Sequence, residues 1–146
     1  MSRSEAGAAL IEMVIVTPVL LLLLFGLIQG GRAVDFALKV SDAAHAGVQF
    51  GSQNHATAAD ITGMETAATN DAATSGVSAT ASNYCRCENG TASVCGQAGA
   101  CSTSHQNLYV EVIVTGTMPS PLNYTFLPAS LKTVTVTRTA IMRVLQ

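Results

Sequence analysis

The sequence contains few of the residues from which large hydrophobic cores are built. It has no tryptophan, aromatic residues are only 5% of its 146 residues, and much of its apolar content is alanine. A large, tightly interlocked core is therefore excluded, and any folded domain must be small and stabilised by additional means. The length allows one such domain beside a membrane anchor, but not two full domains.

Charged residues are also scarce. They make up 11% of the chain, under half of the roughly 25% usual in soluble globular proteins. The formal net charge is −2, and the seven basic residues are scattered without forming a run. Because a nucleic-acid surface needs clustered Lys and Arg side chains to neutralise phosphates, we expect no nucleic-acid partner.

Sequence motifs of catalysis are missing as well. The chain contains no phosphate-binding glycine loop, no G-x-S-x-G and no H-E-x-x-H. His45, His55 and His105 share no metal-ligand spacing, so we assign them no chemistry. The sequence predicts no enzyme, no cofactor and no metal site.

One long apolar segment is present near the N-terminus. Residues 13–31 carry no charge and are dominated by Val, Ile and Leu. That length matches the roughly 20 residues that cross about 30 Å of hydrocarbon as a helix. The segment should be helical because backbone groups in lipid must satisfy their own hydrogen bonds. Pro18 predicts a mild kink, where Thr17 can help to satisfy the backbone group that proline frees.

Two other interpretations of this segment fit less well. A cleaved secretory signal would have a basic N-terminal region, a shorter apolar run and a small-x-small cleavage site. Here Glu5 accompanies Arg3, the run is too long, and Gly30-Gly31-Arg32 is a poor cleavage site. A buried core helix would need covering elements that the rest of the chain does not supply. We therefore predict a retained transmembrane helix.

Glu12 does not fit a plain anchor. A carboxylate at the start of a membrane span costs on the order of 2–3 kcal/mol, so it is a functional hypothesis by default. A position at the membrane interface is the structural alternative. Gly7 lies five residues before Glu12, just ahead of the apolar run.

This arrangement resembles the class III signal of type IV pilins, which a prepilin peptidase cuts after the glycine. Together with Pro18, Gly26 and the Gly31-Arg32 pair, it resembles the opening of TadE-like proteins, the minor pilins or pseudopilins of the tight-adherence (Flp) pilus. The resemblance is specific over about the first fifty residues and general beyond them. Major Flp pilins are far shorter and have tyrosine where Met13 stands, which indicates a minor subunit.

The resemblance implies that cleavage between Gly7 and Ala8 frees an α-amino group on Ala8, with a reference pKa near 7.7–8. Such an amine on a neighbouring subunit could pair with Glu12, because a buried carboxylate needs a partner. A pair of this kind sets the axial register of packed helices more than it adds stability.

The rest of the chain predicts an α+β domain. The first helix should continue through residues 33–51, and residues 57–74 read as a second, alanine-rich helix. Residues 76–82 form a candidate short strand, and residues 108–115 and 133–144 give the strongest strand signals. Val134 and Val136 alternate with threonines, as in an antiparallel sheet with one wet face. Prolines confine the segment from 119 to 128 to a loop.

All four cysteines, Cys85, Cys87, Cys95 and Cys101, lie in one short segment. An even number in an exported domain with a thin core favours disulfides, each worth about 2–4 kcal/mol. Pairing Cys85 with Cys87 would strain the ring, and the sequence does not choose between the other two pairings. A zinc site is the alternative, but the spacing lacks the usual C-x₂-C pairs.

The predicted fold is a long N-terminal helix, transmembrane in its first half, with a small antiparallel sheet as head and a disulfide-bonded loop. The resemblance divides the chain into a leader (1–7), a transmembrane helix (8–31) and an exported head (32–146). It implies a structural subunit in the bacterial inner membrane, with its head outside the cytoplasm and a route into a cell-surface pilus. Its implied partners are other pilins, the assembly machinery, the prepilin peptidase and the membrane. The alternative is a membrane-anchored binding domain that never enters a filament.

Overall fold

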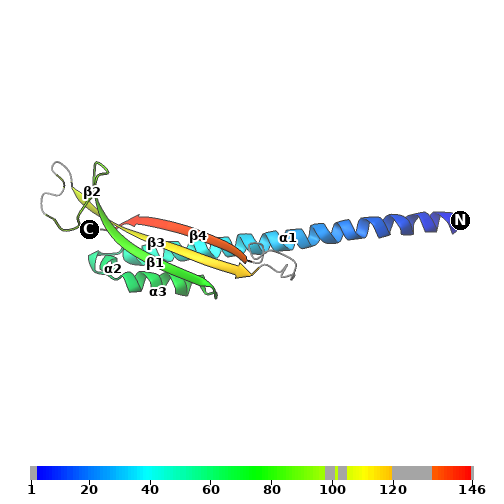
Figure 1. Cartoon of the computed structure of the whole chain (residues 1–146), viewed down its shortest axis with the longest axis horizontal. Coiled ribbons are helices and arrows are strands. Elements are labelled where there is room, and N and C mark those ends of the chain that lie inside the picture. Colours follow the sequence, from blue (N-terminus) through cyan, green and yellow to red (C-terminus); the bar gives the residue numbers. More distant parts are fainter. Residues whose placement is uncertain (1–2, 98–100, 102–104, 120–132, 146) are drawn as a thin grey trace. The chain divides into compact units, whose positions relative to one another are not determined.

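The computed structural model describes residues 3–97, 101, 105–119 and 133–145, and the chain divides into two units, Met1–Asp35 and Phe36–Gln146. Figure 1 shows the elements in chain order. They are α1 (Arg3–Gly51), α2 (His55–Ala59), α3 (Ile61–Ala72), β1 (Val77–Cys87), β2 (Ala92–Ser93), β3 (Gln106–Pro119) and β4 (Thr133–Arg143). Helix α1 contributes to both units.

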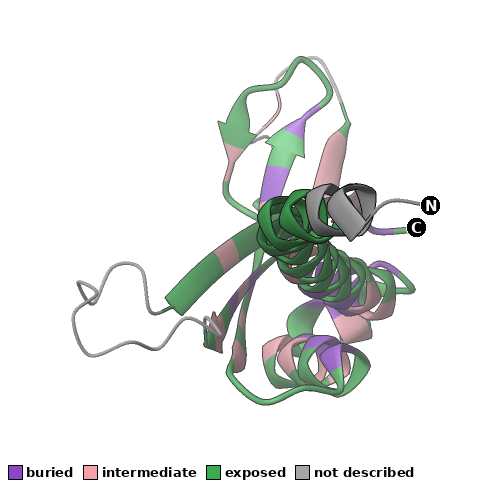
Figure 2. Ribbon diagram, turned by 90° about the vertical axis from the view of Figure 1, so that its right-hand side faces the viewer, coloured by how far each residue is buried: buried purple, intermediate pink, exposed green. Residues whose placement is uncertain are grey.

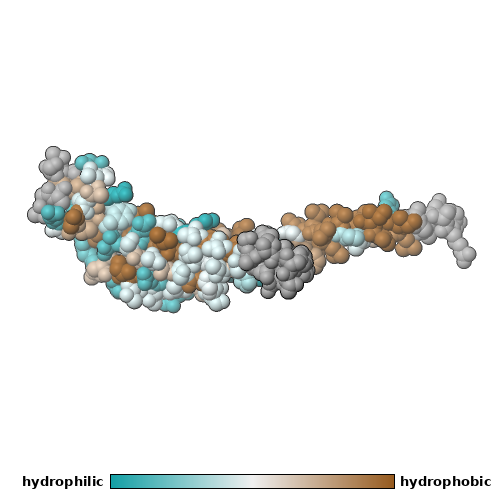
Figure 3. All heavy atoms as spheres, in the orientation of Figure 1, coloured by the Kyte–Doolittle hydropathy of each residue, from teal (hydrophilic) through white to brown (hydrophobic). Residues whose placement is uncertain are grey.

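The first unit is the apolar part of α1. Its side chains from Leu10 to Ile28 are all exposed, which Figure 2 shows in green and Figure 3 as a brown surface. The helix continues through Pro18 without a break. The Thr17 hydroxyl donates to the carbonyl of Met13 at 2.6 Å. The carbonyl that Pro18 deprives of its donor is that of Val14, so Thr17 follows the ordinary i−4 pattern of helical threonines rather than compensating for the proline.

The second unit begins with the amphipathic part of α1. The apolar residues buried here lie on one face of the helix, with spacings that are mostly three or four positions: Phe36, Val40, Ala43, Ala44 and Val48. The helix ends at Gly51, and the amide of Ser52 still donates to the carbonyl of Val48 at 2.9 Å. The predicted continuation of the first helix through residue 51 is therefore confirmed.

The single helix predicted over residues 57–74 is wrong in detail, because the structure has two helices there. Asn54 starts α2 with a capping box, in which its side chain accepts from the amide of Thr57 and the Thr57 hydroxyl accepts from the amide of Asn54. Asp60 then leaves the helical conformation, and its carboxylate accepts from the amide of Gly63 at 2.9 Å. Asp favours such local bonds to the backbone over a helix interior, which explains the break.

The sheet has the order β2-β1-β3-β4, and every neighbouring pair is antiparallel. Both strong strand predictions are confirmed. The short strand predicted over residues 76–82 is longer in the structure, since β1 pairs with β3 from Val77 opposite Gly116 to Cys87 opposite Gln106. Strand β2 was not expected from the sequence. The predicted loop over 119–128 lies, from residue 120 on, outside the described residues.

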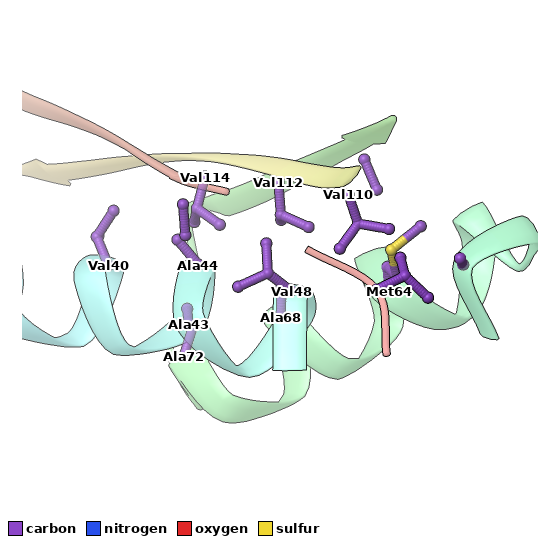
Figure 4. Packing of buried hydrophobic residues seen from close by; sticks show 14 of the residues in the cluster. Val40, Ala43, Ala44, Val48, Met64, Ala68, Ala72, Val110, Val112 and Val114 are labelled. Atoms are coloured by element: carbon purple, nitrogen blue, oxygen red, sulfur yellow. The ribbon is translucent and has the colours of Figure 1, made fainter. Parts of the chain in front are cut away.

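One face of the sheet packs on the helices. Val110, Val112 and Val114 of β3 are fully buried and point toward α1 and α3, as Figure 4 shows. Met64 of α3 is fully buried in the same cluster. The opposite face carries polar and threonine side chains, such as Thr137 on β4. The α+β architecture, with a long helix and a sheet that is wet on one face, is thus the one that the sequence predicted.

Candidate functional site

The residues of the pilin-like motif all lie on α1. Gly7 and Ala8 lie within its helical backbone, and Glu12 follows slightly more than one turn later with an exposed side chain. Among the described residues, Glu12 has no ion-pair partner, so any partner for its carboxylate must come from outside the described chain. The structure therefore brings these residues onto one helix.

The apolar side chains that follow Glu12 are exposed to an unusual degree. Leu22 is 73% exposed, Phe25 61% and Leu27 75%. Each buried apolar side chain of this size is worth roughly 1.5–3 kcal/mol, so leaving a whole helix of them in water would be very unfavourable. Within the described residues, one helix is long and apolar enough to cross a membrane, and none of its most apolar part is buried in the chain. This helix is therefore compatible with a single-pass membrane anchor.

The cysteines stabilise one end of the sheet. Cys85 and Cys87 lie two residues apart on β1, so their side chains leave the same face of the strand. Cys85 is bonded to Cys95 and Cys87 to Cys101, with Cα–Cα distances of 5.2 and 5.6 Å, both in the ordinary range for disulfides. The structure thus contains the predicted disulfide-bonded loop and has one of the two pairings that the sequence left open.

Sequence reasoning missed an aromatic and cationic cluster on the outer face of the sheet. The rings of Tyr84 and Tyr109, which are opposite each other on β1 and β3, stack with centroids 5.7 Å apart. The Arg86 guanidinium lies 5.3 Å from the centroid of the Tyr84 ring. Only strand register brings these residues together, and the sequence did not predict that β1 extends to residue 87.

The histidines are not gathered into a site. His45 lies on α1 in the second unit and His55 starts α2, while the carbonyl of His105 accepts from the amide of Glu88 at 3.0 Å. Among the described residues, no group of three or more His, Cys, Asp or Glu side chains could hold a metal ion.

Comparison with known proteins gives a match for the N-terminal segment. No curated protein and no solved structure matches the chain. A family model does match, and its match begins at Gly7 and includes Glu12, Pro18 and the start of the second unit. This family is a structural one associated with the tight-adherence pilus, as the sequence motifs indicated. Over residues 7–49 the chain thus matches the model of the TadE-like protein family, which confirms the resemblance carried by its motifs.

Proposed function

We propose that this chain is a minor pilin or pseudopilin that takes part in assembling a tight-adherence pilus. The observation that carries the proposal is the family match over residues 7–49, which starts at the glycine of the pilin-like signal. The bare apolar surface of the same helix supports it, because lipid or neighbouring helices are needed to cover that surface.

In this proposal the chain is made as a precursor in the bacterial inner membrane. Residues 1–7 form the leader, residues 8–31 the membrane-spanning helix and residues 32–146 a head outside the cytoplasm. A prepilin peptidase cuts between Gly7 and Ala8. The cut removes Arg3 and Glu5 with the leader and leaves a mature chain that begins with small and apolar residues.

Glu12 has a structural role in the proposal. After cleavage, the α-amino group of Ala8 is cationic over much of the pH range. In a bundle of such helices, the amine of one subunit meets the Glu12 carboxylate of another. Because two desolvated charges gain little net stability but tolerate few geometries, the pair fixes how far the helices slide past each other.

The second unit supplies a folded head and not an active site. It is small, its core is rich in alanine, and two disulfides stabilise the end of the sheet where β1 and β2 meet. Such a head can contact other subunits or a surface without any chemistry of its own.

The first test is the N-terminus of the protein isolated from its native membrane, by intact mass and N-terminal sequencing. The proposal expects a mature chain that starts at Ala8. A charged replacement, Gly7→Glu, should leave the precursor uncut. The matched control is Gly26→Ala on the same helix, where an added Cβ would meet nothing within 4 Å, and cleavage should be unchanged.

Other starting points contradict the proposal in distinct ways. A chain that starts at Met1 or Ser2 would favour the anchored binding domain that never enters a filament. A start beyond Gly30 would make the apolar segment a removed signal and refute membrane anchoring as well.

The role of Glu12 is tested separately, by co-purification of the tagged chain with its pilus partners after crosslinking in the membrane. Glu12→Gln keeps the size of the side chain and removes its charge, and it should reduce co-assembly. Glu5→Gln is the matched control, because Glu5 lies in the leader and is absent from the mature chain. Equal co-assembly of the Glu12 variant and the control would refute the register role.

A further inference from the structure

The two edges of the sheet are covered differently. On the β1 side, β2 pairs with the end of the strand, where Cys85 is opposite Ser93. Further along β1, the amide of Ala81 donates to the Glu65 carboxylate on α3 at 3.1 Å. The side-chain amide of Asn83 donates to the carbonyl of Ala58 on α2 at 2.7 Å. Strand β2 and the two helices therefore occupy the β1 edge.

The other edge is strand β4, which Figure 1 shows beside β3. The amide of Val144 donates to the carbonyl of Leu108 at 2.9 Å, so even-numbered residues of this segment bond to β3. Antiparallel pairs alternate, and the odd-numbered residues of β4 therefore direct their amides and carbonyls away from the sheet. These residues are Thr133, Thr135, Thr137, Thr139, Ile141 and Arg143.

The β1 edge indicates independently which residues direct their amides and carbonyls away from the sheet. Val112 of β3 pairs with Ala81 on one side and with Ala140 on the other. Because Val112 bonds to the even-numbered Ala140, its partner Ala81 must direct its amide outward, and that amide does bond to Glu65. Two separate hydrogen bonds thus agree on which groups each edge exposes.

In the part of the chain that the structure describes, only one side chain bonds to the outer edge of β4. Arg138 donates from Nη1 to the carbonyl of Thr137 at 3.1 Å. The edge otherwise has what a pairing strand requires, since it is 11 residues long, rich in β-branched residues and free of proline. The Arg138 side chain covers one carbonyl of this edge but does not prevent strand pairing, because the amide of a partner strand can replace the guanidinium as the donor to that carbonyl.

We propose that the outer edge of β4 binds an extended, acidic segment of another protein by strand addition. Backbone hydrogen bonds to the amides and carbonyls of Thr135, Thr137 and Thr139 would supply the affinity. The charge of β4 selects the occupant: the strand carries Arg138 and Arg143 and no acidic side chain. Opposite charges across neighbouring strands stabilise the pair, and like charges destabilise it. The inference does not depend on the pilus role.

A second copy of this chain is a poorer occupant for the same reason. Pairing two β4 strands would place one basic strand beside another, with no carboxylate from either strand to compensate. An acidic segment instead offers carboxylates to one of the two arginines, which leave opposite faces of the strand, and its backbone replaces the bond that Arg138 makes to its own strand.

The experiment uses the full chain in detergent micelles and a synthetic extended peptide that alternates valine and glutamate. We expect the peptide to slow hydrogen exchange at the amides of Thr135, Thr137 and Thr139, as followed by NMR. Thr139→Pro removes one outward amide and should weaken peptide binding about tenfold, the loss expected for one net hydrogen bond. Thr139→Val is the matched control: it also loses the hydroxyl but keeps the amide, and its affinity should stay within about twofold of the parent.

A charge reversal keeps the proposal testable if the proline variant unfolds. Arg138→Glu leaves the backbone intact and brings the net charge of β4 to zero, so the valine–glutamate peptide should lose its advantage over a valine–lysine peptide. Equal binding of both peptides to the parent protein would overturn the proposed chemistry. Exchange protection on β1 or on the loop, with none on β4, would overturn the site. Protection of the β4 amides by self-association without peptide would establish the second copy as occupant and overturn the acidic segment.

Discussion

Gly116 is the position in the core where adding a single methyl group should have the clearest effect. It lies in β3, opposite Val136 of β4, and faces the helices. A Cβ added there would lie 2.7 Å from Cζ of Phe36 and 2.8 Å from Cγ2 of Val40, well inside ordinary contact. Gly116→Ala should therefore force the strand or α1 to move.

Two opposing terms set the size of the effect. Overpacking a well-packed core costs about 1–3 kcal/mol. Replacing glycine by alanine inside a strand recovers about 0.5–1 kcal/mol of backbone entropy. The steric term is the larger, and we expect a net loss of about 1–2 kcal/mol in the free energy of unfolding.

A second substitution isolates the cause. Phe36→Leu removes the ring carbons that lie 2.7 and 3.1 Å from the added Cβ. In that background only the clash with Cγ2 of Val40 remains, so Gly116→Ala should cost less than it does in the parent, and the difference should give a coupling of about 1 kcal/mol between positions 36 and 116.

The assay is denaturant unfolding of the full chain in micelles, followed by tyrosine fluorescence. Two of the three tyrosines, Tyr84 and Tyr109, report on β1 and β3, and the chain has no tryptophan to obscure their signal. Circular dichroism in the far ultraviolet would be dominated by α1. If Gly116→Ala were as stable as the parent with or without Phe36→Leu, the packing of α1 on β3 described above would be wrong.

Three further predictions concern the same unit and use the same unfolding assay. Replacing both Cys85 and Cys95 by serine opens a ring between residues 10 apart, and should cost about 2–3 kcal/mol by loop entropy; an unchanged midpoint under oxidising conditions would contradict this. Asn54→Ala removes the cap of α2 and should cost about 1 kcal/mol, whereas Asn54→Ser should cost less, and equal losses would argue against capping. Glu65→Ala leaves the Ala81 amide without its acceptor and should cost about 1–2 kcal/mol, while Glu65→Gln should be close to the parent; a large loss in both variants would point to the charge instead.

The sequence predicted the elements whose patterns are strong over many residues. The apolar run and its amphipathic continuation predicted α1 to its end at Gly51, and the β-branched runs predicted β3 and β4. The break at Asp60 was missed because an alanine-rich period continues across it. The decisive factor is local, namely a carboxylate that caps the next helix at Gly63.

The length of β1 and the disulfide pairing could not be predicted for a different reason. β1 is rich in Ala, Ser and Asn, which have little strand propensity, and its pairing with β3 determines its length. The hairpin with β2 places Cys85 opposite Ser93, two residues before Cys95. The pairing thus follows from strand register, which spacing along the chain does not contain.

The small residues that exclude a large core also allow the helices and the sheet of the second unit to pack closely together. A Cβ on Gly47 of α1 would lie 3.0 Å from Cγ1 of Val112 on β3 and 3.1 Å from the Met64 carbonyl oxygen on α3. The backbone of α1 therefore approaches its neighbours more closely than a larger residue at position 47 would allow. Buried alanines fill the same interface, among them Ala44 and Ala68. Close approach lets short side chains exclude water without aromatic bulk. Such a core has little apolar area to stabilise it, and this accounts for the disulfides at the end of the sheet, where β1 is paired with β2.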